Sequence, residues 1–180
     1  ISRNSKQDQG VACDIHSAGY QPYKKALEKL PSTDQRPLIA LDGITNPQNL
    51  GMIIRSITAS PAYGLLLPSK GCADISALVI KASAGTVFKG NILRCESLAK
   101  ALPAFVEKGF EVCTLSSHQA TPLAEFKPQA PIIYVLGNET EGVSKEIAAL
   151  SKHRVGIPMA NGVESLNVAI TAALIAFSGL

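Results

Sequence analysis

Long apolar runs are missing from this sequence of 180 residues. A membrane-spanning helix needs about 18 consecutive apolar residues, and no run here approaches that length. The N-terminal stretch is polar, which does not fit a secretory signal peptide. We therefore expect a protein of the cytoplasm with no membrane partner.

Metal-ligand patterns are missing as well. The cysteines and histidines are scattered along the chain: Cys13, Cys72, Cys95, Cys113, His16, His118 and His153. No two cysteines form a CxxC pair, and the histidines show no ligand spacing to them or to one another. The sequence therefore predicts free thiols and no bound metal.

A large excess of positive or negative charge is also missing. The formal net charge is only +3, and many proteins that never contact nucleic acid carry as much. Charge alone thus permits an RNA partner without predicting one. A hydrophobic content of 46% with 17% charged residues is ordinary for one globular domain.

Short apolar runs alternate with helical patterns along most of the chain. The predicted strands are residues 38–41, 64–67, 91–95, 110–115, 132–136 and 154–158. Two helices are indicated by apolar residues at helical spacing: Leu50, Ile53, Ile54 and Ile57 in the first, and Leu166, Ala169, Ile170, Ala173, Leu174 and Phe177 in the second. This alternation predicts an α/β fold, a mostly parallel sheet with helices on both faces.

The first 36 residues follow a different pattern. Residues 1–23 have no sustained hydrophobic period, and a short helix is predicted from Tyr23 to Leu30. The loop after it is closed by Pro31 and Pro37. We interpret residues 1–36 as an N-terminal linker or extension, and we expect the folded core to begin at Leu38.

Ligands of parallel sheets bind beyond the carboxyl ends of the strands, and three loops there have unusual composition. The first is DGITNPQNLG, after the first predicted strand. Pro47 and Asn49 are typical of a helix start, with Asn49 as the expected N-cap. Arg55 lies opposite the apolar stripe of this helix. It is either a solvated arginine or a cation held at a cleft, where Gly51 leaves room for a partner.

The second loop, GNETEG, follows the fifth predicted strand and contains Glu139 and Glu141. It is not a P-loop, because the Lys-Ser/Thr pair is missing. Two interpretations stay open. It is a plain turn whose carboxylates lie near a helix N-terminus, or a ligand loop in which a carboxylate orients a polar or cationic group.

The third loop, MANGVES, leads into the last predicted helix. Ser165 suits an N-cap position. Asn167 is then in the first turn, where asparagine is a mediocre helix former, so its side chain should have a partner. Gly162 supplies backbone freedom in the preceding turn.

These three loops, taken together, resemble one family. The stretches NPQNLGMIIRS, VLGNETEGVS and IPMANGVESLNVAI are similar, in order and spacing, to the three signature motifs of the SpoU-type (TrmH-like) RNA ribose 2′-O-methyltransferases. The segment KASAGTVFKGNI, residues 81–92, also looks like an intervening stretch of that family. The resemblance runs from about Leu38 to the C-terminus.

The resemblance implies a C-terminal deep trefoil knot, which sequence periodicity alone does not indicate. It also implies a homodimer, RNA (rRNA or tRNA) as the substrate, and S-adenosylmethionine as the cofactor. The residues that match the family's cofactor pocket are Leu136, Gly137, Ile157, Met159 and Leu166. Those that match its catalytic set are Asn49, Arg55, Glu139, Ser165 and Asn167. We expect Arg55 to grip a phosphate and stabilise charge on the ribose oxygen, because a guanidinium is a poor proton acceptor.

Similarity to the family also bears on domain organisation. QDQGVAC, residues 7–13, looks like the linker that follows an N-terminal RNA-binding domain in many members, with Asp8 in place of their histidine. We therefore expect a missing upstream RNA-binding domain, with residues 37–180 forming the catalytic domain. Thr86 and Phe88 also depart from the commoner family residues.

Two other functions compete with this one. A non-catalytic RNA-binding or dimerisation module of the same fold is the main alternative, although all five catalytic candidates are present. A dinucleotide-dependent oxidoreductase fits poorly, because the first strand is followed by LDGITNPQNLG and not by GxGxxG.

Overall fold

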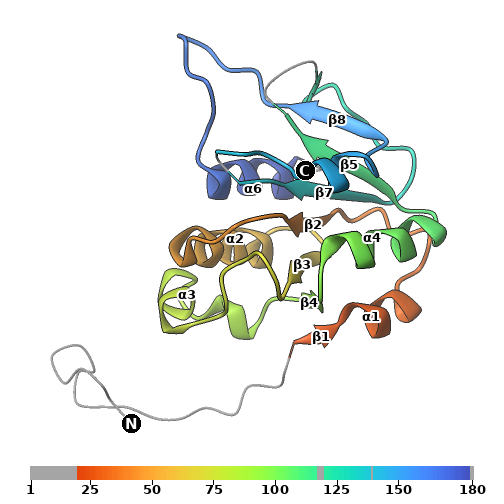
Figure 1. Cartoon of the computed structure of the whole chain (residues 1–180), viewed down its shortest axis with the longest axis vertical. Coiled ribbons are helices and arrows are strands. Elements are labelled where there is room, and N and C mark those ends of the chain that lie inside the picture. Colours follow the sequence, from red (N-terminus) through yellow and green to blue (C-terminus); the bar gives the residue numbers. More distant parts are fainter. Residues whose placement is uncertain (1–19, 117–119, 139, 179–180) are drawn as a thin grey trace, which may run out of the picture.

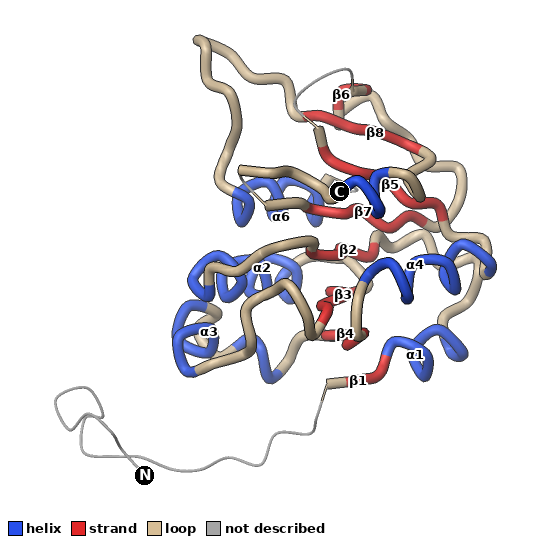
Figure 2. Tube along the Cα trace, in the orientation of Figure 1, coloured by secondary structure: helices blue, strands red, loops and turns tan. Residues whose placement is uncertain are grey.

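A parallel sheet forms the centre of the chain (Figures 1 and 2). The computed structural model describes residues 20–116, 120–138 and 140–178. Within them the sheet has eight strands in the order β1-β4-β3-β2-β7-β5-β8-β6, and every pair of neighbours is parallel. The strands are β1 Gln21–Pro22, β2 Leu38–Leu41, β3 Gly64–Pro68, β4 Ile92–Cys95, β5 Glu111–Leu115, β6 Thr121–Pro122, β7 Ile132–Leu136 and β8 His153–Gly156.

Helices cover both faces of this sheet. They are α1 Tyr23–Lys29, α2 Pro47–Ala59, α3 Ala77–Ala82, α4 Leu98–Glu107, α5 Lys145–Ala148 and α6 Val168–Phe177, with a short 3₁₀ helix, η1, at Thr86–Phe88. In Figure 1, α2, α3 and α6 lie on one side of the strands, and α1 and α4 on the other. The predicted α/β fold is thus confirmed, as are all six predicted strands to within two residues at each end. The two-residue strands β1 and β6 were not predicted.

The core divides into two layers because successive residues of a strand point to opposite faces. Ile39 and Leu41 of β2 pack with α2 and α6 in one cluster. Leu38 and Ala40 of the same strand pack with α1 and α4 in the other. Both faces of the central strands are therefore apolar, which is why these strands are continuous hydrophobic runs in the sequence.

The chain contributes to this core before Leu38, where the sequence predicted its start. Ala26 in α1 and Leu30 just after it are 0% and 2% exposed, and both belong to the cluster under α4. The helix predicted over residues 23–30 is confirmed. The buried positions are few because α1 is only two turns long, so the apolar pattern is too short to distinguish a packed helix from a linker.

The two long helices on one face test the periodicity argument. In α2 the predicted stripe, Leu50, Ile53, Ile54 and Ile57, is buried. In α6 the predicted stripe is wrong, because Ile170, Leu174 and Phe177 are 52%, 45% and 39% exposed. The buried residues of α6 are Val168, Ala169, Ala172, Ile175 and Ala176. This helix is apolar on every side, so its sequence does not indicate which side packs inward.

Gly51 lies at a close contact between helices, not at an open cleft. A Cβ atom at this position would lie 2.4 Å from Cβ of Ala82 and 2.8 Å from the carbonyl oxygen of Val79 in α3. The missing side chain therefore allows α2 and α3 to approach each other. The room predicted beside Arg55 is filled by α3.

Three of the cysteines lie in the described residues, and their thiols are free: Cys72, Cys95 and Cys113. Cys13 lies outside the described residues. Burial raises the pKa of Cys95 and of Cys113 to about 12, so neither thiol is a reactive nucleophile near neutral pH. In the part of the chain that the structure describes, no helix is long and apolar enough to cross a membrane.

Candidate functional site

A cavity of about 380 Å³ opens at the carboxyl ends of β5, β7 and β8, beside the start of α6. Its wall includes all five residues predicted to bind a cofactor: Leu136, Gly137, Ile157, Met159 and Leu166. They come from three separate places in the sequence, the end of β7, the segment after β8 and the approach to α6. The structure therefore brings this predicted set together at the sheet edge where ligands of parallel sheets bind.

Of the predicted catalytic residues that the structure describes, one contributes to the cavity wall. Ser165 lines it. Asn49 and Asn167 lie next to each other, with the Asn167 Nδ2 donating a hydrogen bond of 3.1 Å to the Asn49 Oδ1. Arg55 is exposed on α2 and is not part of the cavity wall. Glu139 lies outside the described residues.

Helix α2 begins three residues earlier than predicted. Its N-cap is Asn46, whose Oδ1 accepts hydrogen bonds from the backbone N–H of Gln48 at 2.8 Å and of Asn49 at 3.3 Å. Pro47 occupies the first helical position, where its fixed φ and missing N–H suit the helix. The predicted N-cap role of Asn49 is therefore wrong. Asn49 lies in the first turn and is only 8% exposed.

Helix α6 begins two residues later than predicted. Asn167 is its N-cap, and the side-chain Oδ1 accepts a hydrogen bond of 2.9 Å from the backbone N–H of Ala169. The N-cap role assigned to Ser165 is wrong. The prediction that Asn167 has a partner is confirmed, because one oxygen caps α6 and the amide nitrogen bonds to Asn49. One side chain therefore joins the starts of α2 and α6.

The polar run before α6 is a turn followed by cavity wall. Asn161 and Gly162 have φ values of +55° and +72°, in the left-handed region that Gly adopts most readily. The turn is closed by a 3.1 Å hydrogen bond from the N–H of Val163 to the carbonyl of Ala160. Glu164 lines the cavity directly after this turn.

Some residues of the cavity were not predicted. Thr114, Leu115 and Ser116 line it from the end of β5, and Arg154 lines it from β8. The strand itself was predicted, but its position next to β7 depends on the strand order, which periodicity does not give. Arg154 is an exposed cation on a wall that also contains Glu141 and Glu164. The cavity thus combines apolar, cationic and carboxylate groups.

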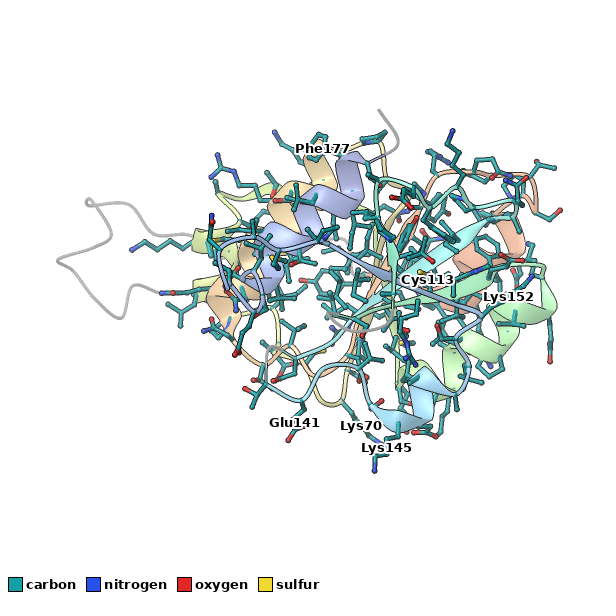
Figure 3. All side chains as sticks on the ribbon, turned by 90° about the horizontal axis from the view of Figure 1, so that it is seen from above. Lys70, Cys113, Glu141, Lys145, Lys152 and Phe177 are labelled. Atoms are coloured by element: carbon teal, nitrogen blue, oxygen red, sulfur yellow. The ribbon has the colours of Figure 1, made fainter. Side chains whose placement is uncertain are left out.

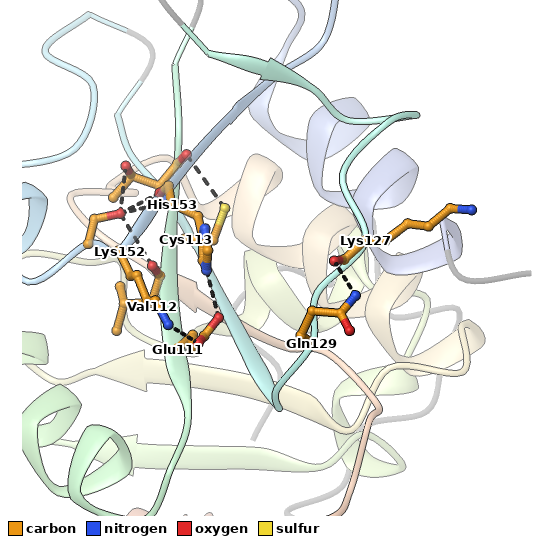
Figure 4. A network of polar contacts seen from close by, with 9 residues as sticks. Glu111, Val112, Cys113, Lys127, Gln129, Lys152 and His153 are labelled. Carbon is orange, nitrogen blue, oxygen red and sulfur yellow. Dashed lines mark hydrogen bonds and ion pairs between the residues drawn. The ribbon is translucent and has the colours of Figure 1, made fainter.

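A second polar cluster lies at the opposite ends of β5 and β8 (Figure 4). The Glu111 carboxylate, at the start of β5, contacts the Lys152 ammonium and, at 2.6 Å, the His153 Nε2. Hydrogen bonds from Lys152 and then His153 lower the pKa of Glu111 below its usual value. Glu111 begins β5, and the other end of β5 reaches the cavity. The cluster therefore holds β8 beside β5 at the end of the sheet that lies away from the site.

The comparisons with known proteins agree on one family. The SpoU rRNA Methylase family matches residues 36–177. A protein of Mycolicibacterium vanbaalenii, named an uncharacterized tRNA/rRNA methyltransferase, is 32% identical over 169 residues, which cover 93% of this chain and 54% of that protein. The chain spans about half the length of the curated relatives it matches.

Solved structures show the same fold. The AdoMet-bound rRNA methyltransferase of Sinorhizobium meliloti superposes with a TM-score of 0.78 at 26% identity, over 89% of this chain and 60% of that one. An RNA 2′-O ribose methyltransferase superposes with a TM-score of 0.72 at 29% identity, over 83% of this chain and 57% of that one.

Proposed function

The chain belongs to the SpoU rRNA Methylase family, and on this premise we propose that it transfers a methyl group from S-adenosylmethionine to a ribose 2′-hydroxyl of structured rRNA or tRNA. The observation that carries the proposal is that the wall of one cavity contains all five predicted cofactor residues. The S. meliloti relative binds AdoMet, and another relative is an RNA 2′-O ribose methyltransferase.

The residues of the cavity fit S-adenosylmethionine. A volume of about 380 Å³ is in the range of small-molecule sites. Leu136, Ile157 and Leu166 offer apolar surface for the adenine ring. Glu141 and Glu164 offer carboxylates, which attract the cationic sulfonium and amino groups. When bound, the cofactor supplies an electrophilic methyl group on sulfur, and the chemistry requires no metal.

The chain's own task is then alignment and charge stabilisation. Holding the ribose oxygen in line with the methyl group makes the reaction effectively unimolecular. Arg55 is exposed, and its planar fork of donors suits a phosphate group of the RNA. We assign it to gripping that phosphate and stabilising negative charge as it develops on the ribose oxygen. Ser165, in the cavity wall, and Glu139 are assigned to orienting the reacting groups.

Asn49 and Asn167 hold the frame on which this alignment depends. Their hydrogen bond connects the helix that carries Arg55 to the helix that follows the cofactor wall. A deep C-terminal trefoil knot is part of the same proposal. The resemblance to the family supports it, and after β8 the chain runs outward and returns, so that α6 packs beside α2 (Figure 1).

A homodimer through α6 is the proposed assembly. The outer side of α6 exposes Ile170, Leu174 and Phe177, and Met52 of the adjacent α2 is 42% exposed. Phe177 lies at the opposite edge of the molecule from Glu141 (Figure 3). Exposed apolar side chains on two packed helices are typical of an interface. Arg55 is exposed on the same α2 helix, so this dimer would place it near the subunit boundary.

We expect Leu174→Asp to convert the dimer to a monomer, because a carboxylate in an apolar interface loses its hydration without gaining a partner. Light scattering at micromolar protein concentration measures this. Val106 on α4 is also 45% exposed but lies over the other face of the sheet, so Val106→Asp is the matched control and should leave the mass unchanged. A wild-type protein that is already monomeric would contradict the assembly.

The activity itself is tested in two steps. Calorimetric titration with S-adenosylmethionine should show binding to the wild-type chain. RNA from cells that lack the gene is then incubated with protein and cofactor, and 2′-O-methylated positions are mapped in rRNA and tRNA. New methylation at a discrete ribose supports the proposal. Absence of any response to the cofactor would favour a non-catalytic RNA-binding module.

A further inference from the structure

We propose that Asn138 is a positioning residue that connects the cofactor wall to the loop leading into α2. This inference rests on the proposed function, since it concerns how the same cavity is shaped. Asn138 follows β7 and lines the cavity. Its side chain uses both ends of the amide group, one within its own loop and one across to the neighbouring loop after β2.

The oxygen of the Asn138 amide shapes the β7 loop. It accepts a hydrogen bond of 2.8 Å from the N–H of Thr140 and a longer one, 3.4 Å, from the N–H of Glu141. The backbone of Asn138 also exchanges two hydrogen bonds with Gly142, at 2.8 and 3.1 Å. The loop is thereby folded back onto Gly137, where a Cβ atom would lie 2.1 Å from the Gly142 carbonyl carbon.

The nitrogen of the same amide reaches the other loop. The Asn138 Nδ2 donates a hydrogen bond of 3.0 Å to the carbonyl oxygen of Gly43, two residues after β2. Gly43 has a φ of +76°, and a Cβ atom there would lie 3.4 Å from Cβ of Asn138. The loop after β2 is therefore bent into a left-handed turn directly against Asn138.

A second connection lies one residue before Gly43. The Asp42 Oδ2 accepts a hydrogen bond of 2.8 Å from the N–H of Ser144, which is 102 positions away in the sequence. The N–H of Asp42 also donates to the carbonyl of Leu136 at 2.8 Å. Asp42 and Asn138 thus join the loop after β2 to the chain after β7 at Leu136, Asn138 and Ser144.

These contacts of Asp42 and Asn138 couple the cofactor wall to the loop that leads into α2. Gly137, Asn138, Gly142 and Val143 all line the cavity. From Gly43, which bonds to Asn138, residues 43–46 lead to Asn46, the N-cap of α2. This helix carries Asn49 and Arg55. A wall that is held in place before the cofactor arrives costs less to order on binding. Asn138 should therefore contribute to cofactor affinity without contacting the reacting atoms.

Asn138→Asp isolates the connection between the loops. The carboxylate keeps an oxygen that accepts from Thr140, but it cannot donate to the Gly43 carbonyl. We expect this variant to weaken S-adenosylmethionine binding about tenfold relative to wild type at pH 8, the effect of one lost hydrogen bond in a partly buried position.

Asn91→Asp is the matched control. The Asn91 Nδ2 donates to the Tyr63 carbonyl at 2.9 Å, the same kind of bond, at the opposite end of the sheet. This variant should bind the cofactor like wild type. Asn138→Ala loses both bonds of the side chain and should bind at least as weakly as Asn138→Asp. Wild-type affinity of Asn138→Asp would overturn the proposal.

Hydrogen exchange of the ligand-free protein gives a readout that does not depend on the proposed function. Amides of residues 140–144 should exchange faster in Asn138→Asp than in wild type at the same pH, and should not change in Asn91→Asp. Unchanged exchange there overturns the positioning role. Failure of the wild-type chain to bind S-adenosylmethionine, with faster exchange in the variant, instead removes the proposed function and leaves the connection between the loops established.

Discussion

Arg55→Ala is expected to bind S-adenosylmethionine with near wild-type affinity while its methyl-transfer rate falls by a factor of about 10² to 10³, the range for loss of one charge-stabilising donor. The affinity should persist because Arg55 is not part of the cavity wall, and because its positive charge does not attract the positively charged sulfonium of the cofactor. The rate should fall because the RNA phosphate loses its partner. Calorimetry measures the first quantity, and transfer of a labelled methyl group to RNA measures the second.

Arg55→Lys refines the assignment. A lysine keeps the positive charge but loses the planar fork that binds two phosphate oxygens at once, so we expect most of the deficit to remain. Arg36→Ala is the control, because Arg36 is also an exposed arginine but pairs with Asp34 and lies over the Tyr63 ring. Wild-type methylation by Arg55→Ala at saturating cofactor would mean that Arg55 is simply a solvated surface residue.

Periodicity predicted those parts of the fold in which burial is one-sided or complete. β2 is a continuous apolar run because it is covered on both faces, and α2 has a stripe because it is buried on one side. The prediction for α6 failed because its sequence has no such one-sided pattern. α6 is apolar all round, so its inward side is set by the close approach of small residues such as Ala172 to α2, which no pattern of hydrophobicity contains.

Capping shows a similar limit. Several residues with suitable side chains precede each helix, and propensity does not decide among them. Asn46 caps α2 because Pro47 must occupy the first helical turn, whereas Asn49 is turned toward Asn167. The resemblance to a known family named five residues that line the cavity, but the end of β5 escaped prediction. Its place beside β7 follows from strand order, a property of the whole chain.

Asn167→Ala is expected to weaken both cofactor binding and methyl transfer. Its oxygen caps α6 and its nitrogen bonds to Asn49, so alanine removes the cap, worth about 1 kcal/mol, and frees the start of α6 from α2. Leu166, one residue earlier, lines the cavity, and movement of this helix start disturbs the wall. We expect about a tenfold loss of S-adenosylmethionine affinity, a larger loss of transfer, and a fall of about 2–4 °C in melting temperature.

Asn167→Asp separates the two bonds of this side chain. The carboxylate still accepts from the N–H of Ala169 and suits a helix N-terminus, so the melting temperature should return to the wild-type value. It cannot donate to the Asn49 Oδ1, and the alignment of α2 with the cofactor wall should remain impaired. Methyl transfer should therefore stay low in Asn167→Asp although the helix is capped. Full recovery of transfer along with stability would instead show that donation from Asn167 to Asn49 contributes nothing to the reaction.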